Sequence, residues 1–219
     1  MLTINDKDFQ RLVTFVHQNY GIDLSKKRQL IIGRLSNTIL SMGFSSFEQY
    51  IDNLVTNKKP EDLELMLNKL TTNYTFFMRE GAHFELFKDT ILPYLVETKK
   101  DKVLSIWSAA CSSGEEPYTI SMIIKEFFGA KASAWDTRVL ATDISQNALI
   151  AAKNAVYDED SLKELSPGWK SKYFRSTGQP GTYTVAPEIK SNVIFRTFNL
   201  MDPIRFRLKF DVIFCRNVM

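Results

Sequence analysis

The sequence predicts an α/β protein in which a small helical bundle precedes a doubly wound, mostly parallel sheet. Three observations predict this fold. Apolar residues repeat at helical spacing over the first third of the chain. After residue 99, short apolar runs alternate with helical patterns, which is typical of a parallel sheet. The stretch 157–190, with several Pro and Gly residues, breaks this alternation, and we interpret it as a small antiparallel β insertion.

Four helices are predicted in the first domain, residues 1–80. Each combines apolar residues at helical spacing with boundary residues that begin or end helices. The predicted boundaries are Gly21 after the first helix, Ser25 before and Gly43 after the second, Ser45 with Glu48 as a capping box for the third, and Pro60 in the first turn of the fourth.

Residues 81–98 are predicted to form a connecting helix, kinked at Pro93. The second domain, 99–219, begins after it. Its predicted parallel strands are 103–110, 139–143, 193–198 and 210–215, with helices at 117–128 and 145–155.

Composition narrows the class of protein. A chain of 219 residues with 44% hydrophobic and 24% charged residues is typical of a globular protein. Cys111 and Cys215 end apolar runs, which argues against a disulfide framework or a zinc site.

Residues 1–20 do not resemble a signal peptide, and no apolar run approaches the roughly 18 residues of a membrane span. We expect a cytoplasmic protein without membrane insertion. A net charge of +3 is too small to name a partner, and we expect no nucleic-acid partner.

The turn 108–117 joins the first predicted strand to its helix. Open α/β sheets bind nucleotide-like ligands at such turns, and small residues here allow a close backbone approach. A single glycine also occurs in such turns for steric reasons alone. Asp143 strengthens the prediction because it ends the second strand, where a carboxylate can accept hydrogen bonds from ribose hydroxyls. The alternative is that Asp143 caps the helix beginning at Ser145.

Five segments mark these turns and strand ends. They are LTTNYTFFMRE at 70–80, WSAACSSGEEPY at 107–118, ATDI at 141–144, FNL at 198–200 and IFCRNVM at 213–219. In order and spacing they resemble the chemotaxis receptor glutamate O-methyltransferases of the CheR type, and the resemblance covers nearly the whole chain. It implies a Rossmann-like sheet that binds S-adenosylmethionine and releases S-adenosylhomocysteine.

The resemblance also implies a set of site residues. A carboxylate and a guanidinium suit the ammonium and the carboxylate of the cofactor's methionine part. Arg79 would be the catalytic residue, acting by positioning, and we expect its segment to lie against the turn 108–116. The alternative is that Arg79 pairs with Glu80 or Glu85 on a helix surface. The implied cofactor-binding residues are Asn73, Thr75, Arg79, Glu116, Asp143, Asn199, Leu200, Arg216 and Asn217.

The activity implied is methyl transfer to receptor glutamates in sensory adaptation. A non-catalytic module that binds S-adenosylmethionine or S-adenosylhomocysteine and signals through its helical domain is the alternative. A nicotinamide-dependent oxidoreductase fits less well, because the turn 108–117 lacks three spaced glycines.

The partner implied by the resemblance is a methyl-accepting chemotaxis receptor. Lys26, Lys27, Arg28 and Arg34 lie in a stretch without acidic residues, and in the family this helix meets acidic receptor helices. The alternative is a solvated helix face. The loop 176–181 is shorter than in members that hold a receptor's C-terminal peptide, so we expect no such tether.

The family's catalytic domain continues beyond the fourth strand. We therefore expect the chain to be truncated at its C-terminus, with its last strand an exposed edge open to self-association. A span of this kind can bind the cofactor without being active.

Overall fold

The chain divides into two units in the computed structural model, which describes residues 2–71, 74–207 and 209–218. Among these residues, the helical unit comprises 2–71 together with 199–203. The sheet unit comprises 74–198 together with 204–218, apart from residue 208. The proposed domain boundaries after residues 80 and 98 stay predictions.

The helical unit contains the four helices that the apolar spacing predicts. Their inward faces are fully buried, with Leu12, Ile31, Leu35 and Tyr50 among the core residues. This burial stabilises short helices that would be marginal in isolation. The helices are α1 (Asp6–Tyr20), α2 (Arg28–Ser41), α3 (Phe47–Asn57) and α4 (Pro60–Leu70).

Two predicted helix starts in this unit are wrong. Helix α2 begins after Lys27 without a side-chain cap, whereas the backbone N–H of Ser25 donates to Asp23. Helix α3 is capped by Ser46, whose hydroxyl accepts from the N–H of Gln49, and not by Ser45 with Glu48. Ser45 and Ser46 are adjacent, so the pattern alone does not choose between them. Tertiary packing of the apolar face of α3 sets the register.

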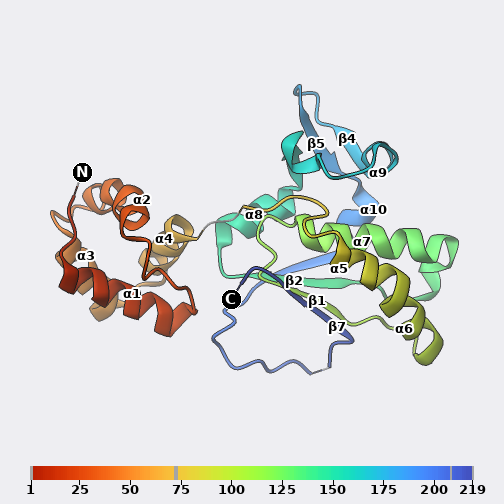
Figure 1. Ribbon diagram of the computed structural model, residues 1–219, viewed down its shortest axis with the longest axis horizontal. Helices are drawn as coiled ribbons and strands as arrows, with labels where there is room; N and C mark the ends of the chain where they lie inside the picture. Colours follow the sequence, from red (N-terminus) through yellow and green to blue (C-terminus); the bar gives the residue numbers. More distant parts are fainter. Residues whose placement is uncertain (1, 72–73, 208, 219) are drawn as a thin grey trace. The chain divides into compact units, whose positions relative to one another are not determined.

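The sheet unit is built on a four-stranded parallel sheet, as the alternating pattern predicts. The strand order is β6-β2-β1-β7, so the first core strand lies between the second and the fourth along the chain (Figure 1). In such an order the crossovers leave in opposite directions on either side of β1, which creates a crevice at the carboxyl ends. The strands are β1 (Ile106–Ala109), β2 (Val139–Asp143), β6 (Val193–Thr197) and β7 (Val212–Cys215).

The predicted connecting helix contains a π-turn before its proline. The N–H of Leu92 bonds to the carbonyl of Phe87, five residues back, and Pro93 follows directly. A proline ring displaces the carbonyl four residues before it, and the wider turn accommodates that displacement.

Within the described residues no helix is long and apolar enough to cross a bilayer. Around the sheet lie α5 (Ala82–Leu86), η1 (Phe87–Ile91), α6 (Leu92–Thr98), α7 (Glu115–Phe128), η2 (Gly129–Ala134) and α8 (Gln146–Asn154).

The antiparallel insertion is confirmed as a second, three-stranded sheet of order β3-β5-β4. It projects from the sheet unit beyond α7 and α10 (Figure 1). Buried aromatic residues, Tyr157, Tyr173 and Phe174, join it to the core of the unit. Its elements are β3 (Val156–Asp158), η3 (Asp160–Leu162), α9 (Pro167–Tyr173), β4 (Phe174–Ser176), β5 (Thr182–Val185) and α10 (Pro187–Lys190).

Candidate functional site

The turn between β1 and α7 has an unusual backbone. Ala110, Ser112 and Gly114 all have positive φ angles, of 60°, 50° and 97°. A Cβ on Gly114 would lie 2.9 Å from the Cβ of Ala152, so only glycine fits there. Left-handed backbone at non-glycine residues costs free energy and persists only where surrounding contacts hold it. We call residues 110–114 the cofactor turn.

Asp143, at the end of β2, is one of those contacts. Its carboxylate accepts from the backbone N–H of Ser112 at 2.7 Å and from that of Ser145 at 2.9 Å. Burial raises the pKa of Asp143, and these backbone hydrogen bonds oppose the rise. Helix α8 has its own cap, the hydroxyl of Ser145, which accepts from Ala148. A carboxylate has about four acceptor positions, so Asp143 can hold the turn and also receive ligand hydroxyls.

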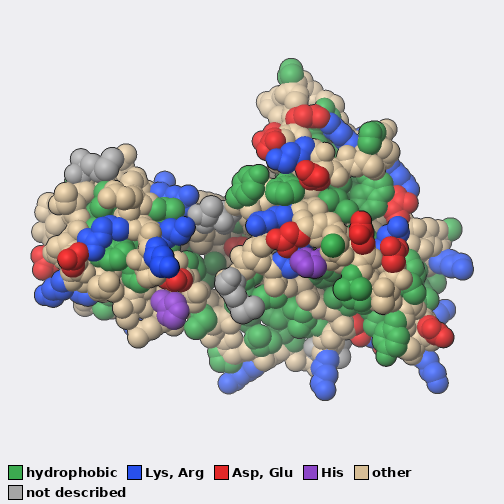
Figure 2. Space-filling view, viewed as in Figure 1, with side chains coloured by type: hydrophobic (Ala, Val, Ile, Leu, Met, Phe, Trp, Pro, Cys, Tyr) green, Lys and Arg blue, Asp and Glu red, His purple; other side chains and the backbone are tan. Residues whose placement is uncertain are grey.

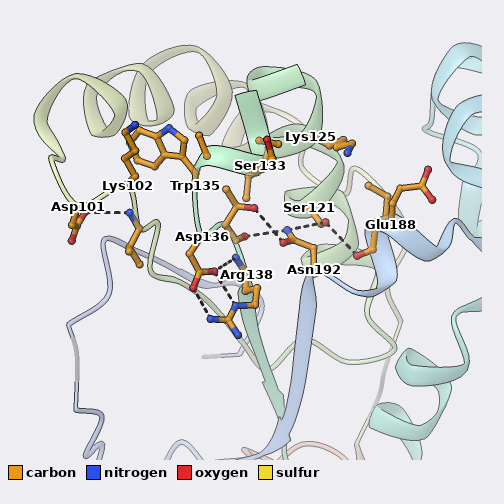
Figure 3. A pocket seen from close by; sticks show the side chains of 16 residues that line it. Asp101, Lys102, Ser121, Lys125, Ser133, Trp135, Asp136, Arg138, Glu188 and Asn192 are labelled. Atoms are coloured by element: carbon orange, nitrogen blue, oxygen red, sulfur yellow. Dashed lines mark hydrogen bonds and ion pairs between the residues drawn. The ribbon is translucent and has the colours of Figure 1, made fainter. Parts of the chain in front are cut away.

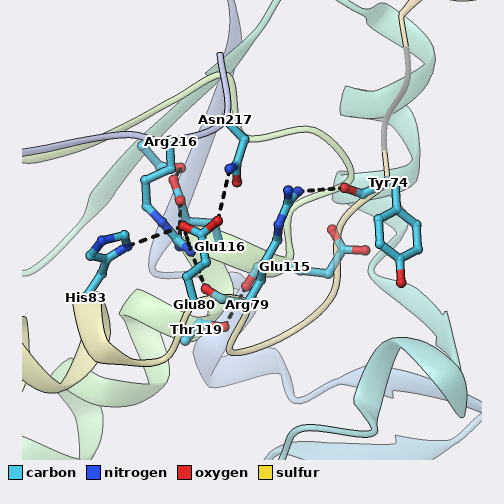
Figure 4. A network of polar contacts seen from close by, with 10 residues as sticks. Tyr74, Arg79, Glu80, His83, Glu115, Glu116, Thr119, Arg216 and Asn217 are labelled. Atoms are coloured by element: carbon cyan, nitrogen blue, oxygen red, sulfur yellow. Dashed lines mark hydrogen bonds and ion pairs between the residues drawn. The ribbon is translucent and has the colours of Figure 1, made fainter. Parts of the chain in front are cut away.

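Arg216, directly after β7, joins three segments of the sheet unit (Figure 4). Its guanidinium donates to Glu116 on α7 at 3.0 Å, to Glu80 at 3.3 Å, and to the carbonyl oxygen of Arg79. It also lies 4.8 Å from the ring centre of Phe84. One rigid, planar group therefore fixes the relative positions of the β7 end, the start of α7 and the 79–80 segment.

Glu116 is held from two sides in this cluster. Its second carboxylate oxygen accepts from the hydroxyl of Ser108, on β1, at 2.7 Å. Burial raises the pKa of Glu116, whereas Ser108 and Arg216 lower it. Asn217 joins the same cluster through Glu80, because its side-chain amide donates to the Glu80 carboxylate at 3.0 Å. The predicted residues Glu116, Arg216 and Asn217 thus belong to one polar network.

The Arg79 side chain bonds back to the backbone of its own segment, residues 74–79. Its guanidinium donates to the carbonyl oxygen of Tyr74 at 2.9 Å, and among the described residues it forms no ion pair with Glu80 or Glu85. The alternative of a surface pair is therefore not what the structure contains. As expected, the segment lies against the β1–α7 turn region, because Arg216 contacts both the Arg79 carbonyl and Glu116.

The other predicted site residues are placed less directly. Thr75 is half-buried in the sheet unit. Asn199 and Leu200 belong to the helical unit, where the Asn199 amide donates to the carbonyl of Asn19 at 2.8 Å. Asn73 lies outside the described residues. A role in cofactor binding stays a prediction for these four, as it does for the other predicted site residues.

Two buried polar atoms of the sheet unit bear on whether the site fits the predicted cofactor. Within the described residues, the hydroxyl of Ser112 and Nε of Arg216 are buried without a hydrogen-bond partner. Such groups are rare because they cost free energy. Both lie on residues at the carboxyl ends of the strands. A ligand with hydroxyls, a carboxylate and an ammonium has the groups to pair with them and with Asp143 and Glu116, so the residues fit.

A cavity of about 830 Å³ lies at the opposite edge of the sheet, before the starts of β1, β2 and β6 (Figure 3). Five of its polar side chains are joined by hydrogen bonds or an ion pair within the lining. Arg138 binds Asp136, and Asn192 bonds with Thr137 and Ser121. None of the predicted site residues lines this cavity.

Sequence reasoning missed three residues of the candidate site, two in the Arg216 network and one in the cofactor turn. The sequence indicates Ser108 and Ser112 only as small turn residues, and Glu80 only as an alternative surface partner of Arg79. The signal for Ser108 is its place near the end of β1. Its neighbour Ala109 pairs with Cys215 on β7, and Arg216 follows Cys215 directly. Side chains that leave adjacent parallel strands at one edge lie within hydrogen-bonding reach.

Comparison with known proteins identifies the family of this chain. A family model described as the SAM binding domain of CheR methyltransferase matches residues 73–219, and one described as the all-alpha domain of CheR methyltransferase matches 7–71. A "Chemotaxis protein methyltransferase" of Borreliella burgdorferi is 40% identical over 100% of this chain and 78% of the relative. "Chemotaxis protein methyltransferase 1" of Pseudomonas aeruginosa is 37% identical over 97% and 78%, and the Escherichia coli relative 35% over 100% and 75%. The chain therefore belongs to the CheR methyltransferase family.

Proposed function

We propose that this chain transfers a methyl group from S-adenosylmethionine to glutamate side chains of chemotaxis receptors, forming methyl esters. The observation that carries this proposal is the Arg216 network, which joins Glu116 to the Arg79 segment beside the first strand. It lies where open α/β sheets bind ligands, in a chain that belongs to a methyltransferase family. The alternative, a non-catalytic binding module, is not favoured, since the matched relatives are named as methyltransferases.

The cofactor supplies a methyl group on a sulfonium, and the chain supplies placement. A receptor glutamate, with a reference pKa of about 4.3, is already ionised at neutral pH, so no general base is required. The reactants carry opposite charges that partly cancel in the transition state. A cation beside the acceptor would therefore stabilise the reactants more than the transition state. Alignment of the reacting groups can lower the barrier by about 7–11 kcal/mol.

Within this scheme Arg79 is a positioning residue. Its guanidinium closes the segment 74–79, and the backbone of that segment is bound by Arg216. We expect Glu116 to receive the ammonium of the cofactor, and Asp143 its ribose hydroxyls. Arg216 keeps the Glu116 carboxylate oriented, because it donates to one oxygen and leaves the other to Ser108.

Arg79→Ala is expected to weaken cofactor binding and to lower turnover together. A lost charged hydrogen bond is worth about 1.5–3 kcal/mol, which is roughly 10- to 100-fold in affinity. Titration calorimetry and incorporation of labelled methyl into receptor helices measure the two effects. Arg175→Ala is the matched control, because Arg175 also donates to backbone carbonyls but lies in the insertion. Unchanged affinity and turnover in Arg79→Ala would remove Arg79 from the site.

The basic surface of the helical unit divides into two kinds of residue. Arg28 pairs with Asp6 at 2.5 Å, and Arg34 donates to the carbonyls of Lys69 and Thr71. These arginines take part in holding the bundle together. Lys26 and Lys27 are exposed just before α2, and Figure 2 shows Lys and Arg side chains spread over the visible face of the helical unit. We therefore assign receptor steering mainly to the lysines.

The double variant Lys26→Glu, Lys27→Glu is expected to slow receptor methylation about tenfold at low ionic strength, because steering depends on long-range attraction. The difference should shrink as salt screens the charges. Initial rates across a salt series measure it, with cofactor affinity unchanged. Lys58→Glu, Lys59→Glu is the control, since this exposed pair lies between α3 and α4. Equal rates for both double variants at low salt would exclude the steering role.

The other partner expectations rest on the sequence alone. Self-association through the β7 edge, the absence of a receptor tether, the absence of a nucleic-acid partner and a cytoplasmic location stay predictions. The same holds for truncation at the C-terminus.

A further inference from the structure

Tyr157 reaches the cofactor turn from outside the parallel sheet. It lies on β3, the first strand of the insertion, and only 6% of it is exposed. Its hydroxyl donates to the carbonyl oxygen of Ser113 at 2.7 Å. Like Asp143, it is a side chain from another element that holds the backbone of this turn. Nothing in the proposed reaction so far uses it.

The position of this hydrogen bond matters because the turn is continuous with the site. Ser113 is followed by Gly114, and the two residues after that begin α7 with Glu115 and Glu116. A Cβ on Gly114 would lie 3.1 Å from the Tyr157 hydroxyl, so the tyrosine packs closely against the turn. A shift of Ser113 would therefore move the start of α7 and with it the Glu116 carboxylate.

The same tyrosine also contacts the Arg79 segment. The rings of Tyr157 and Phe77 meet edge to face, with centroids 4.9 Å apart, and Phe77 is fully buried. The N–H of Phe77 donates to the carbonyl of Ser161 at 3.1 Å. Ser161 is in turn held by Asp158, the last residue of β3. Residues 156–162 of the insertion thus brace both sides of the site, namely the cofactor turn and the segment that carries Arg79.

We propose that Tyr157 is a positioning residue for cofactor binding, and that through it the insertion sets the geometry of the cofactor turn. This inference rests on the proposed function of the site. The Tyr157 hydroxyl holds the turn in its left-handed conformation, and its ring holds Phe77. Loss of the hydroxyl alone frees the Ser113 carbonyl while the ring packing against Phe77 and Tyr118 is kept.

The test separates this role from general packing by comparing two tyrosines of the insertion. Tyr157→Phe removes the bond to Ser113. Tyr173→Phe removes a bond of equal length, 2.7 Å, from another buried tyrosine to Glu126, far along α7 from its start. Both variants keep their rings. The full chain is used, and binding of S-adenosylmethionine and S-adenosylhomocysteine is measured by calorimetry at a temperature where thermal melts show both variants folded.

The expected result is that Tyr157→Phe raises the Kd of both molecules about three- to tenfold, the range for one lost neutral hydrogen bond, and Tyr173→Phe leaves it within twofold. The KM for cofactor should rise in the same proportion, with the KM for receptor unchanged. Equal Kd values for the two variants, or a change in receptor KM alone, would overturn the positioning role. Failure of the parent chain to bind either molecule would instead overturn the proposed function.

Discussion

Arg216→Ala is expected to lower the free energy of unfolding by about 3–5 kcal/mol, the usual cost of removing one partner of a buried ion pair, and to abolish cofactor binding. The Arg216 side chain is 11% exposed and that of Glu116 13%, so removal of the guanidinium leaves a carboxylate with little access to water. The bonds to Glu80 and to the Arg79 carbonyl are lost with it. Denaturant unfolding and calorimetric titration measure the two effects.

Two further variants show whether charge or shape matters. Arg216→Lys keeps the charge but not the planar fork, so it should recover part of the stability and little of the binding. Arg138→Ala breaks an exposed pair with Asp136, where the Arg138 side chain is 60% exposed, and should change the free energy of unfolding much less than Arg216→Ala. If Arg216→Ala unfolded like Arg138→Ala and still bound cofactor, the Arg216 network would not be the organising feature of the site.

Glu115 is expected to make the stability of the protein fall as pH rises toward neutrality. It is the first residue of α7, only 3% exposed, and its carboxylate accepts from the Ser113 hydroxyl at 3.0 and 2.8 Å. Burial raises its pKa from 4.5 to about 7, with the Ser113 hydrogen bond opposing the rise. The folded state therefore retains a proton that the unfolded state releases above pH 4.5. The stabilisation is complete below that pH and is lost as pH approaches 7.

The size of this effect follows from the shift in pKa. At about 1.36 kcal/mol per pH unit, a rise from 4.5 to about 7 corresponds to roughly 3 kcal/mol. Glu115→Gln mimics the protonated carboxyl, so its advantage over the parent should grow between pH 4.5 and 8. Glu188→Gln, at an exposed position on α10, is the control and should follow the parent. If the difference in free energy of unfolding between the parent and Glu115→Gln were the same at every pH, Glu115 would not retain a proton in the folded state, and the prediction would be wrong.

Local patterns in the sequence were sufficient to predict the class of fold and the elements that carry the site. Helical and strand periodicity depend on which residues face a core, and that information is written within a dozen residues. The parallel sheet, the helical bundle and the insertion were predicted for this reason. The same patterns placed Glu116 after the first strand and Arg216 after the fourth. Where two local choices were equivalent, as with Ser45 and Ser46, the sequence did not decide.

The tertiary structure decided which groups meet. Arg216 and Glu116 are 100 residues apart, and only the parallel register of β1 and β7 brings them together. Two further hydrogen bonds depend on tertiary structure in the same way. They are the bond from the Ser112 N–H to the Asp143 carboxylate and the bond from the Tyr157 hydroxyl to the Ser113 carbonyl. A hydrogen bond requires a donor–acceptor distance that varies by only a few tenths of an ångström. Such distances are fixed by packing over the whole unit. The resemblance of the sequence therefore named Glu116, Arg216 and Asp143, but their partners Ser108, Glu80 and the Ser112 N–H emerged only from the structure.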